Sequence, residues 1–490
     1  MEKSRVVSIA LCGTIAYLVI LPVIQYLIDA KGLRKYPNYF WLSPFTDFKY
    51  CYLFAQGFRS RDLYLAHKRT RNPILRIGPD SLSFCDSRVI KYIYGHVTAC
   101  AKDIKEDVLA GSHRNLFDVV DKLLSAAFAL KKLERWEYKV ASTTEWLVRA
   151  FDRLCTAPLD GQRLDPADLT VDFCKWINLW TIEAINSIAP SARTDLLDTG
   201  SDEVVTERRD STLYKARYRF SLEQSALFSS IFCWEYNLFP WVEWLIGLFE
   251  FIVYYQAAER LKKYLAGEKL DDFFQSLMED KSGNPNNLQR GEIVSEVGAI
   301  INAGSDTTAM ALTQTLHLLI QHPRHLEALR NELDLVLEPD DVIAPYGKVK
   351  DLPYLRACID EGLRAMPPTA AGLPRRTPAQ GAQIMGEWIA GDTSVNITIY
   401  AAHMTETLFP DPESFRPERW LKAESRRSAE SGFIPFSAGA RSCIGRNFTY
   451  LEQIMVRPSL QLGRKEALNM ICGSMPIKIW RRKVEVEWEY

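Results

Sequence analysis

The sequence predicts a mainly α-helical protein with a minor β-sheet region, formed as one large domain behind an N-terminal transmembrane helix. Helical patterns dominate the first two thirds of the 490 residues, and short segments rich in Pro, Gly and β-branched residues follow late in the chain. A long uncharged run lies near the N-terminus. The composition, 47% hydrophobic and 25% charged, is that of a folded globular chain, which excludes disordered and collagen-like classes.

The charge balance and the cysteines exclude several kinds of protein. With 60 Lys and Arg against 61 Asp and Glu, the formal net charge is -1, so the chain lacks the broad basic surface of a nucleic-acid binder. The ten cysteines form no CxxC pair and no close cluster, as a zinc site or a disulfide framework would require. We therefore expect no nucleic-acid partner and a reducing compartment.

The N-terminal run from Val6 to Ile28 carries no charge and is long enough to cross a bilayer as one helix. A cleaved signal peptide is the alternative, but it would have a shorter apolar region and a small-residue cleavage site. Three basic residues follow the run and two precede it, which favours a cytosolic location for the rest of the chain. The predicted organisation is an anchor over residues 1–30 and one domain over residues 31–490.

Turn-forming composition predicts surface loops at Asp195–Ser211, Asp280–Gln289 and Glu338–Val349. Pro374–Tyr400 has the composition of short strands. A second apolar region, Ala226–Tyr255, is interrupted by charges and a proline, which argues against a second membrane span. It fits either a buried helix pair or an amphipathic surface that dips into the membrane, because periodicity does not separate the two.

The most informative stretch surrounds one cysteine, Cys443, which lies between Gly439 and Gly445. A thiolate that binds the metal of a flat cofactor needs main chain close to the cofactor face, which glycine permits. Arg441 can pair with an anionic group of the same cofactor, and Phe436 can shield the sulfur from water. Five specified residue types within ten positions make a chance match rare.

This stretch resembles the haem-binding signature of the cytochrome P450 superfamily, the haem-thiolate monooxygenases. The resemblance implies a single-domain cytochrome P450 fold and haem b bound through the Cys443 thiolate. On a helix predicted from about Glu292 to His322, Asp306 and Thr307 are similar to the family's oxygen-activating pair. An acid beside a hydroxyl is a plausible proton relay, in which Thr307 holds water and Asp306 links it to solvent.

Further positions extend the resemblance over nearly the whole chain. Glu361 and Arg364 share a helix face, and Arg419 is similar to the third member of the family's buried Glu–Arg–Arg network, which is structural. Arg375 resembles an arginine that meets a haem propionate. His403 is a weaker candidate of the same type, because a lone histidine is more often a satisfied core residue.

The chain also departs from the family pattern. The family carries a Trp or His followed four residues later by Arg, both reaching a haem propionate, whereas Asn115–Phe128 contains neither. Either Phe117 and Asp121 occupy those positions, or about two turns of helix are missing; Trp136 is a poorly placed substitute. Pro458 would break the helix that follows the cysteine. These departures predict weakened haem retention.

The resemblance implies a membrane-bound monooxygenase of fungal type that oxidises a small hydrophobic molecule in secondary-metabolite biosynthesis or aromatic metabolism. No GxGxxG fingerprint is present, so electrons from NADPH would arrive through a separate membrane flavoprotein reductase, with cytochrome b5 as a possible second donor. Lys131, Lys132 and Arg135 could help to dock it, although such clusters are usually solvated surface. The expected location is the endoplasmic reticulum membrane, single-pass and facing the cytosol. The alternatives are a haem-thiolate isomerase or dehydratase that consumes no oxygen, and a non-catalytic member with impaired haem binding.

Overall fold

The computed structural model describes residues 20–56, 58–102, 127–155, 170–207, 213–218, 251–338, 341, 343–454, 464–466, 470–472 and 475–478. The helices are α2 (Leu21–Ile28), α3 (Phe48–Gln56), α4 (Arg59–Thr70), α5 (Ile90–Ile93), α8 (Leu130–Arg135), α9 (Glu137–Cys155), α10 (Phe173–Ile188), α11 (Leu196–Thr199), α14 (Phe251–Leu265), α15 (Phe273–Met278), α16 (Arg290–Gln321), α17 (Pro323–Asp334), α18 (Tyr346–Val349), α19 (Pro353–Ala365), α20 (Ile399–His403), α21 (Ala423–Glu430) and α22 (Arg446–Ile454). The strands are β1 (Ile74–Gly78), β2 (Ser81–Phe84), β3 (Ala101–Lys102), β4 (Thr170–Asp172), β5 (Glu203–Glu207), β6 (Leu213–Arg217), β7 (Arg375–Arg376), β8 (Ala382–Ile384), β9 (Glu387–Ile389), β10 (Ser394–Ile397), β11 (Arg464–Glu466), β12 (Met470–Cys472) and β13 (Pro476–Lys478). The predicted mainly helical class with small sheets is confirmed.

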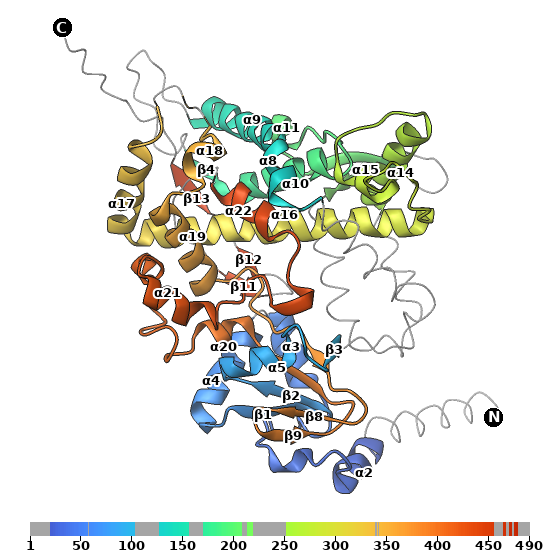
Figure 1. Ribbon diagram of the computed structural model, residues 1–490, viewed down its shortest axis with the longest axis vertical. Helices are drawn as coiled ribbons and strands as arrows, with labels where there is room; N and C mark the ends of the chain where they lie inside the picture. The colour runs from blue at the N-terminus through green and yellow to red at the C-terminus, as the bar shows by residue number, and fades with distance from the viewer. Residues whose placement is uncertain are drawn as a thin grey trace, which may run out of the picture.

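The long helix α16 runs across the molecule, with α8, α9, α10 and α14 on one side and the main sheet on the other (Figure 1). Its start is fixed by a capping box, in which the Gln289 amide donates to the Glu292 carboxylate at 2.7 Å. Its end precedes Pro323, which begins α17. The helix expected at about 292–322 is therefore confirmed.

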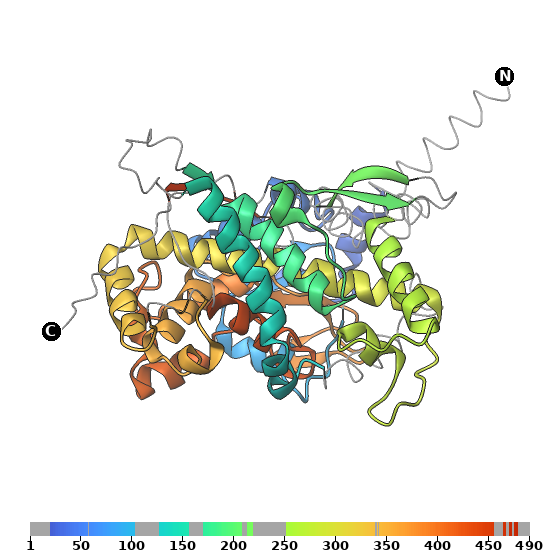
Figure 2. The same cartoon turned by 90° about the horizontal axis from the view of Figure 1, so that it is seen from above.

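The helical side of the core is formed by α9, α10 and α16. Nearly every residue of α10 is buried, because it packs along α16 on one side and α9 on the other. Seen from above, α9 crosses over α16 (Figure 2). This packing buries α16 on most of its surface and holds the predicted relay residues on a rigid element.

The main sheet has the strand order β1-β2-β10-β7-β3, with β10 parallel to β2 and the other pairs antiparallel. The strands predicted within Pro374–Tyr400 are confirmed as β7 to β10. The last residues of that range instead begin α20, because the Thr398 hydroxyl accepts the Ala401 amide at 3.1 Å and caps a helix.

Of the three predicted loops, Asp280–Gln289 contains neither helix nor strand and is confirmed. The prediction for Asp195–Ser211 was wrong, since this range contains α11 and β5, and β5 pairs with β6. Its β-branched Val204, Val205 and Thr206 favour a strand once a partner strand is available. The loop prediction for Glu338–Val349 was wrong for its last four residues, which form α18.

The described part of the predicted anchor is α2, none of whose residues is buried. Among the residues that the structure describes, no helix has both the length and the apolar character needed to cross a bilayer. Residues 6–19 of the predicted span lie outside the described residues, as do residues 226–250 of the second apolar region. The anchor therefore stays a prediction.

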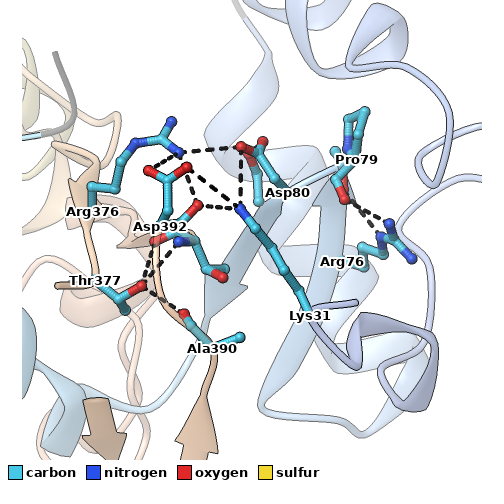
Figure 3. A network of polar contacts seen from close by, with 11 residues as sticks. Lys31, Arg76, Pro79, Asp80, Arg376, Thr377, Ala390 and Asp392 are labelled. Atoms are coloured by element: carbon cyan, nitrogen blue, oxygen red, sulfur yellow. Dashed lines mark hydrogen bonds and ion pairs between the residues drawn. The ribbon is translucent and has the colours of Figure 1, made fainter. Parts of the chain in front are cut away.

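The segment after α2 is tied to the main sheet by a polar network (Figure 3). The Lys31 ammonium lies 3.8 Å from the Asp80 carboxylate and 3.9 Å from that of Asp392, and it donates to the Asp392 carbonyl. Arg376 joins the same two carboxylates at 3.2 and 3.0 Å. Each exposed pair is weak, about 0–1 kcal/mol, but together they fix where the chain leaves the domain.

Candidate functional site

The loop from Phe436 to Gly445 folds back on itself before α22. The Cys443 amide donates to the Phe436 carbonyl at 2.8 Å, and the Ser442 amide donates to the Gly439 carbonyl at 3.1 Å within a short 3₁₀ turn. The Cys443 side chain is exposed and lies shortly before the first residue of α22. A negative charge near the N-terminal end of a helix is stabilised by the helix dipole, so this position suits a thiolate.

The two glycines that frame Cys443 have different roles. Gly439 has φ +70°, and a Cβ there would lie 1.8 Å from the main-chain carbonyl oxygen of Tyr94. Both the left-handed conformation and the close approach require glycine. At Gly445 a Cβ would lie 3.7 Å from the Cys443 sulfur and 3.9 Å from Phe128, which is ordinary contact. Within the described residues, nothing excludes a side chain at Gly445.

Phe436 links the loop to the helix behind it. Its ring lies 5.4 Å from that of Tyr450 on α22, and the Arg446 guanidinium is 6.0 Å from its centroid. Its carbonyl holds the Cys443 amide. The described contacts of Phe436 therefore brace the loop.

Arg375 and Arg441 are brought together beside this loop. Arg375 is buried, lies 4.9 Å from the Tyr94 ring, and donates to the carbonyls of Leu373 and Pro374 at 3.3 and 3.1 Å. Burial lowers the pKa of Arg375, and the nearby charge of Arg441 lowers it further. Among the described residues, no carboxylate forms an ion pair with Arg375. Two neighbouring guanidinium charges suit an anionic ligand.

The predicted relay residues lie near the middle of α16. The Thr307 hydroxyl donates to the Ala303 carbonyl at 2.7 Å, which leaves its oxygen able to accept. Ala303 is exposed, and Asp306 and Thr307 are half-buried, although most of the helix is buried. Ala299, one turn earlier, is exposed as well, so the middle of the helix is open over the turns that lead to Thr307, as contact with a cofactor or substrate requires.

Glu361, Arg364 and Arg419 are brought together as the sequence predicted. Glu361 accepts two bonds from Arg364, at 2.8 and 2.9 Å, and one from Arg419 at 3.1 Å. The Glu361 carboxylate also accepts the Trp420 indole N–H at 3.0 Å and the Arg416 amide at 2.9 Å. Glu361 and Arg364 have no exposed side-chain surface. This is a paired, hydrogen-bonded buried network.

The network reaches the segments that precede the cysteine loop. Arg364 also donates to the carbonyls of His403, Pro412 and Ser414 at 3.2, 2.8 and 3.2 Å. It therefore joins α19 to α20 and to the chain leading toward Trp420. A structural role, rather than a chemical one, fits these contacts.

His403 is fully buried, and main-chain groups engage both of its ring nitrogens. Its Nδ1 lies 3.2 Å from the Arg364 carbonyl, and its Nε2 accepts the Ile434 amide at 3.0 Å. Its ring stacks on Phe433 at 5.4 Å, and burial lowers its pKa to about 3. A neutral, fully bonded imidazole offers no N–H to a propionate, so the geometry favours the core role weighed for this residue.

Other sequence predictions fall on or near undescribed residues. Phe117 and Asp121 lie outside the described residues. Trp136, the proposed substitute, is buried against Phe273, with ring centroids 4.8 Å apart. Lys132 donates to Ser276 at 2.9 Å, which removes it from the exposed cluster predicted to dock a reductase. Lys131 and Arg135 are exposed on α8, which packs against α22.

Two residues with clear roles in this geometry were missed from the sequence. The carbonyl oxygen of Tyr94 lies against Gly439, and its ring packs against the Arg375 guanidinium. Its hydroxyl donates to the Leu373 carbonyl at 2.8 Å. Glu452 on α22 is a fully buried carboxyl group. No local pattern marks either residue, because a tyrosine just after a short helix and a glutamate on an amphipathic helix are both common.

The chain is similar to known proteins in sequence and in fold. The chain is 28% identical to benzoate 4-monooxygenase bphA of Aspergillus niger, over 90% of this chain and 89% of that protein. It is 27% identical to tryprostatin B 6-hydroxylase of Aspergillus fumigatus, over 83% of this chain and 70% of that protein. The heme domain of cytochrome P450DA has a similar fold, with a TM-score of 0.67 at 18% identity over 86% of this chain and 92% of that one. The family model "Cytochrome P450" matches residues 94–456. The chain therefore belongs to the cytochrome P450 family.

Proposed function

We propose that the chain is a haem-thiolate monooxygenase that inserts one atom of O2 into a small hydrophobic organic molecule. The observation that carries this proposal is the exposed Cys443 thiol at the start of α22, in a loop whose turn requires Gly439. Haem, when bound, would supply the activation of oxygen. The names of the relatives, a benzoate 4-monooxygenase and a tryprostatin B 6-hydroxylase, support an aromatic substrate of fungal metabolism.

The described residues fit haem in three respects. Cys443 offers a thiolate from an exposed position. Arg375 lies near enough to Arg441, beside the same loop, for the two charges to interact, and a pair of guanidinium groups suits two propionates. A Cβ at Gly445 would lie 3.7 Å from the Cys443 sulfur, and no described residue requires glycine at this position. A flat group that approaches the main chain beside the sulfur would require it.

The protein's own groups then have distinct tasks. Cys443, Arg375 and Arg441 would hold and orient the cofactor. The Thr307 oxygen accepts a hydrogen bond from a bound water, and Asp306, half-buried on the same helix turn, exchanges protons with solvent. The Glu361, Arg364 and Arg419 network keeps the segments before the loop in place.

Electrons would come from NADPH through a separate membrane reductase, and the exposed Lys131 and Arg135 on α8 are its proposed contacts. The apolar residues of α2 support attachment to a membrane, since Leu27 and Ile28 are 63% and 68% exposed. We place the chain at the endoplasmic reticulum as a single-pass protein whose domain faces the cytosol.

The first test of this function is the carbon-monoxide difference spectrum of reduced membranes that contain the full chain. We expect a red-shifted haem-thiolate band, which Cys443→Ser should remove. Product formation should require both O2 and a reductase. Product without O2 would favour an isomerase or dehydratase, and full-length protein without any haem band would favour the non-catalytic alternative.

Replacing Thr307 with alanine should uncouple electron use from product formation. The variant loses the hydroxyl that holds water, so NADPH consumption should continue while product per NADPH falls about tenfold. Both quantities are measured in one reconstituted assay. Thr307→Ser keeps the hydroxyl and should restore coupling; equal coupling in the alanine variant and the wild type would remove Thr307 from the relay.

A further inference from the structure

The strand β7 consists of two arginines, Arg375 and Arg376, whose side chains have different surroundings. Neighbouring residues of a strand point to opposite faces of the sheet. The Arg375 guanidinium lies against the Tyr94 ring, and no carboxylate of the described residues forms an ion pair with it. Arg376 instead contacts two carboxylates, those of Asp80 and Asp392. One arginine is therefore neutralised within the protein, and the other keeps its charge available to a ligand.

Main-chain pairing alone holds β7 through few contacts, because the strand is two residues long. It pairs with β10 on one edge and with β3 on the other. The next residue, Thr377, is bonded to the turn between β9 and β10 (Figure 3). Its amide donates to the Thr393 carbonyl at 3.0 Å, and its hydroxyl donates to the Ala390 carbonyl at 2.7 Å. Its carbonyl accepts the Asp392 amide at 3.2 Å. The position of β7 is therefore tied to the turn that carries Asp392.

Asp392 presents both its carbonyl and its carboxylate to the same two cations. It has φ +54°, a left-handed conformation that aspartate adopts more readily than most residues. Its carbonyl accepts Arg376 at 2.9 Å and also accepts Lys31, and its carboxylate lies 3.0 Å from Arg376. The Asp80 carboxylate is shared in the same way, at 3.2 Å from Arg376 and 3.8 Å from Lys31. Two positive and two negative charges thus balance in what we call the Arg376 network, which consists of Lys31, Asp80, Arg376 and Asp392.

Lys31 is the member of the Arg376 network that comes from outside the sheet region. It belongs to the segment after α2, whereas Asp80 lies between β1 and β2, and Asp392 lies between β9 and β10. The side chains of Lys31 and Arg376 are only 29% and 17% exposed, so solvent screens their charges incompletely. Without Lys31, one guanidinium would face two carboxylates, and their mutual repulsion would favour moving the Asp392 turn away.

We propose that the Arg376 network positions Arg375 for its ligand. By holding β7 from one side, the network keeps the Arg375 guanidinium on the other side, where it would meet a carboxylate of the cofactor. The N-terminal segment thereby takes part in cofactor retention, with Lys31 acting only through β7. This inference rests on the proposed monooxygenase function, because it requires haem to be the anion that Arg375 holds.

The first test is the rate at which the purified full chain loses haem to an excess of apomyoglobin. Asp392→Asn removes one shared carboxylate but keeps a residue that tolerates the left-handed turn. Lys31→Met removes one shared cation. Each variant should lose haem about three- to fivefold faster than the wild type, since a partly exposed ion pair changes an equilibrium by up to about fivefold. Rates equal to that of the wild type in both variants would overturn the proposal.

Lys35→Met is the matched control. Lys35 lies in the same N-terminal segment and pairs with Glu387 at 2.8 Å. Glu387 belongs to β9, whose only partner strand among the described residues is β8, so this ion pair does not reach β7. The control removes an exposed ion pair of the same kind and should lose haem at the wild-type rate. If it loses haem as fast as Lys31→Met, any contact of the N-terminal segment suffices, and the specific role of the Arg376 network is wrong.

A double-mutant cycle shows whether the network acts through Arg375. In an Arg375→Met background the guanidinium to be positioned is absent, so adding Asp392→Asn should change the rate of haem loss by less than about twofold. The same three- to fivefold effect in both backgrounds would show a general structural role and would overturn the positioning role.

A second measurement needs no haem. In the apoprotein, peptides that contain β7 should exchange amide hydrogen for deuterium about threefold faster in Asp392→Asn and Lys31→Met than in the wild type and in Lys35→Met. Unchanged exchange would overturn the proposal, because β7 would then be held without the network. A wild-type chain that never shows a haem-thiolate band would instead overturn the proposed function, and the exchange result would still decide whether the network holds β7.

Discussion

Glu361→Gln is expected to destabilise the folded protein by about 3–5 kcal/mol, the range found when one partner of a buried ion pair is removed. Arg364 and Arg419 would keep their charges in the interior without a counter-charge. The new amide nitrogen would also face N–H donors, because both Glu361 oxygens now accept bonds from arginine or indole nitrogens. We expect most of the haem-thiolate band to be lost.

Glu452→Gln is the matched control, because it makes the same substitution at an equally buried glutamate. Burial raises the pKa of Glu452 well above its usual value, and no described cation pairs with its carboxyl group, so the change in unfolding free energy should be well below that of Glu361→Gln. Urea unfolding of both variants, followed by far-ultraviolet circular dichroism and by the haem band, measures the difference. Equal losses would show that burial alone, rather than the ion-pair network, determines the cost.

Gly439→Ala should abolish haem binding while leaving most of the helical domain folded. The added methyl group would lie 1.8 Å from the Tyr94 carbonyl oxygen, and a main-chain atom does not move away cheaply. Displacing the Tyr94 segment would also move the ring under Arg375. The expected result is normal helical content by circular dichroism with no haem-thiolate band.

Gly32→Ala separates the clash from the conformational penalty. Gly32 has φ +62° but no atom within 4 Å of a built Cβ, so alanine there incurs only the left-handed penalty of about 1–2 kcal/mol. This variant should keep its haem band. If the left-handed penalty alone were responsible for the loss, both glycine variants would lose the band to a similar degree.

The sequence allowed the local features to be predicted. The helix that carries Asp306 and Thr307 was found within two residues at each end, because its capping box and the following proline are local signals. The shared helix face of Glu361 and Arg364 also follows from a local feature, their spacing of three residues on α19. The resemblance added Arg419, which helical periodicity alone does not connect to them.

Features that depend on distant pairing could not be predicted. The β5 strand was taken for a loop because the charged and turn-forming residues of Asp195–Ser211 outweigh its three β-branched residues, and its pairing with β6 is not visible in the local sequence. The contact between Tyr94 and Gly439 joins segments far apart in the chain. The burial of Glu452 depends on how α22 packs against α16, which the spacing of its apolar residues does not reveal.

The network around Lys31 has a consequence for the order in which the protein is made. Its partner Asp392 follows it by 361 positions. A ribosome that adds about 5–20 residues per second needs roughly 20 to 70 seconds to cover that distance. During this interval the segment after α2 has emerged, but the carboxylate and the strand that hold it have not. The junction between the N-terminal segment and the domain is therefore among the last contacts to close, after the helices between them have had time to fold.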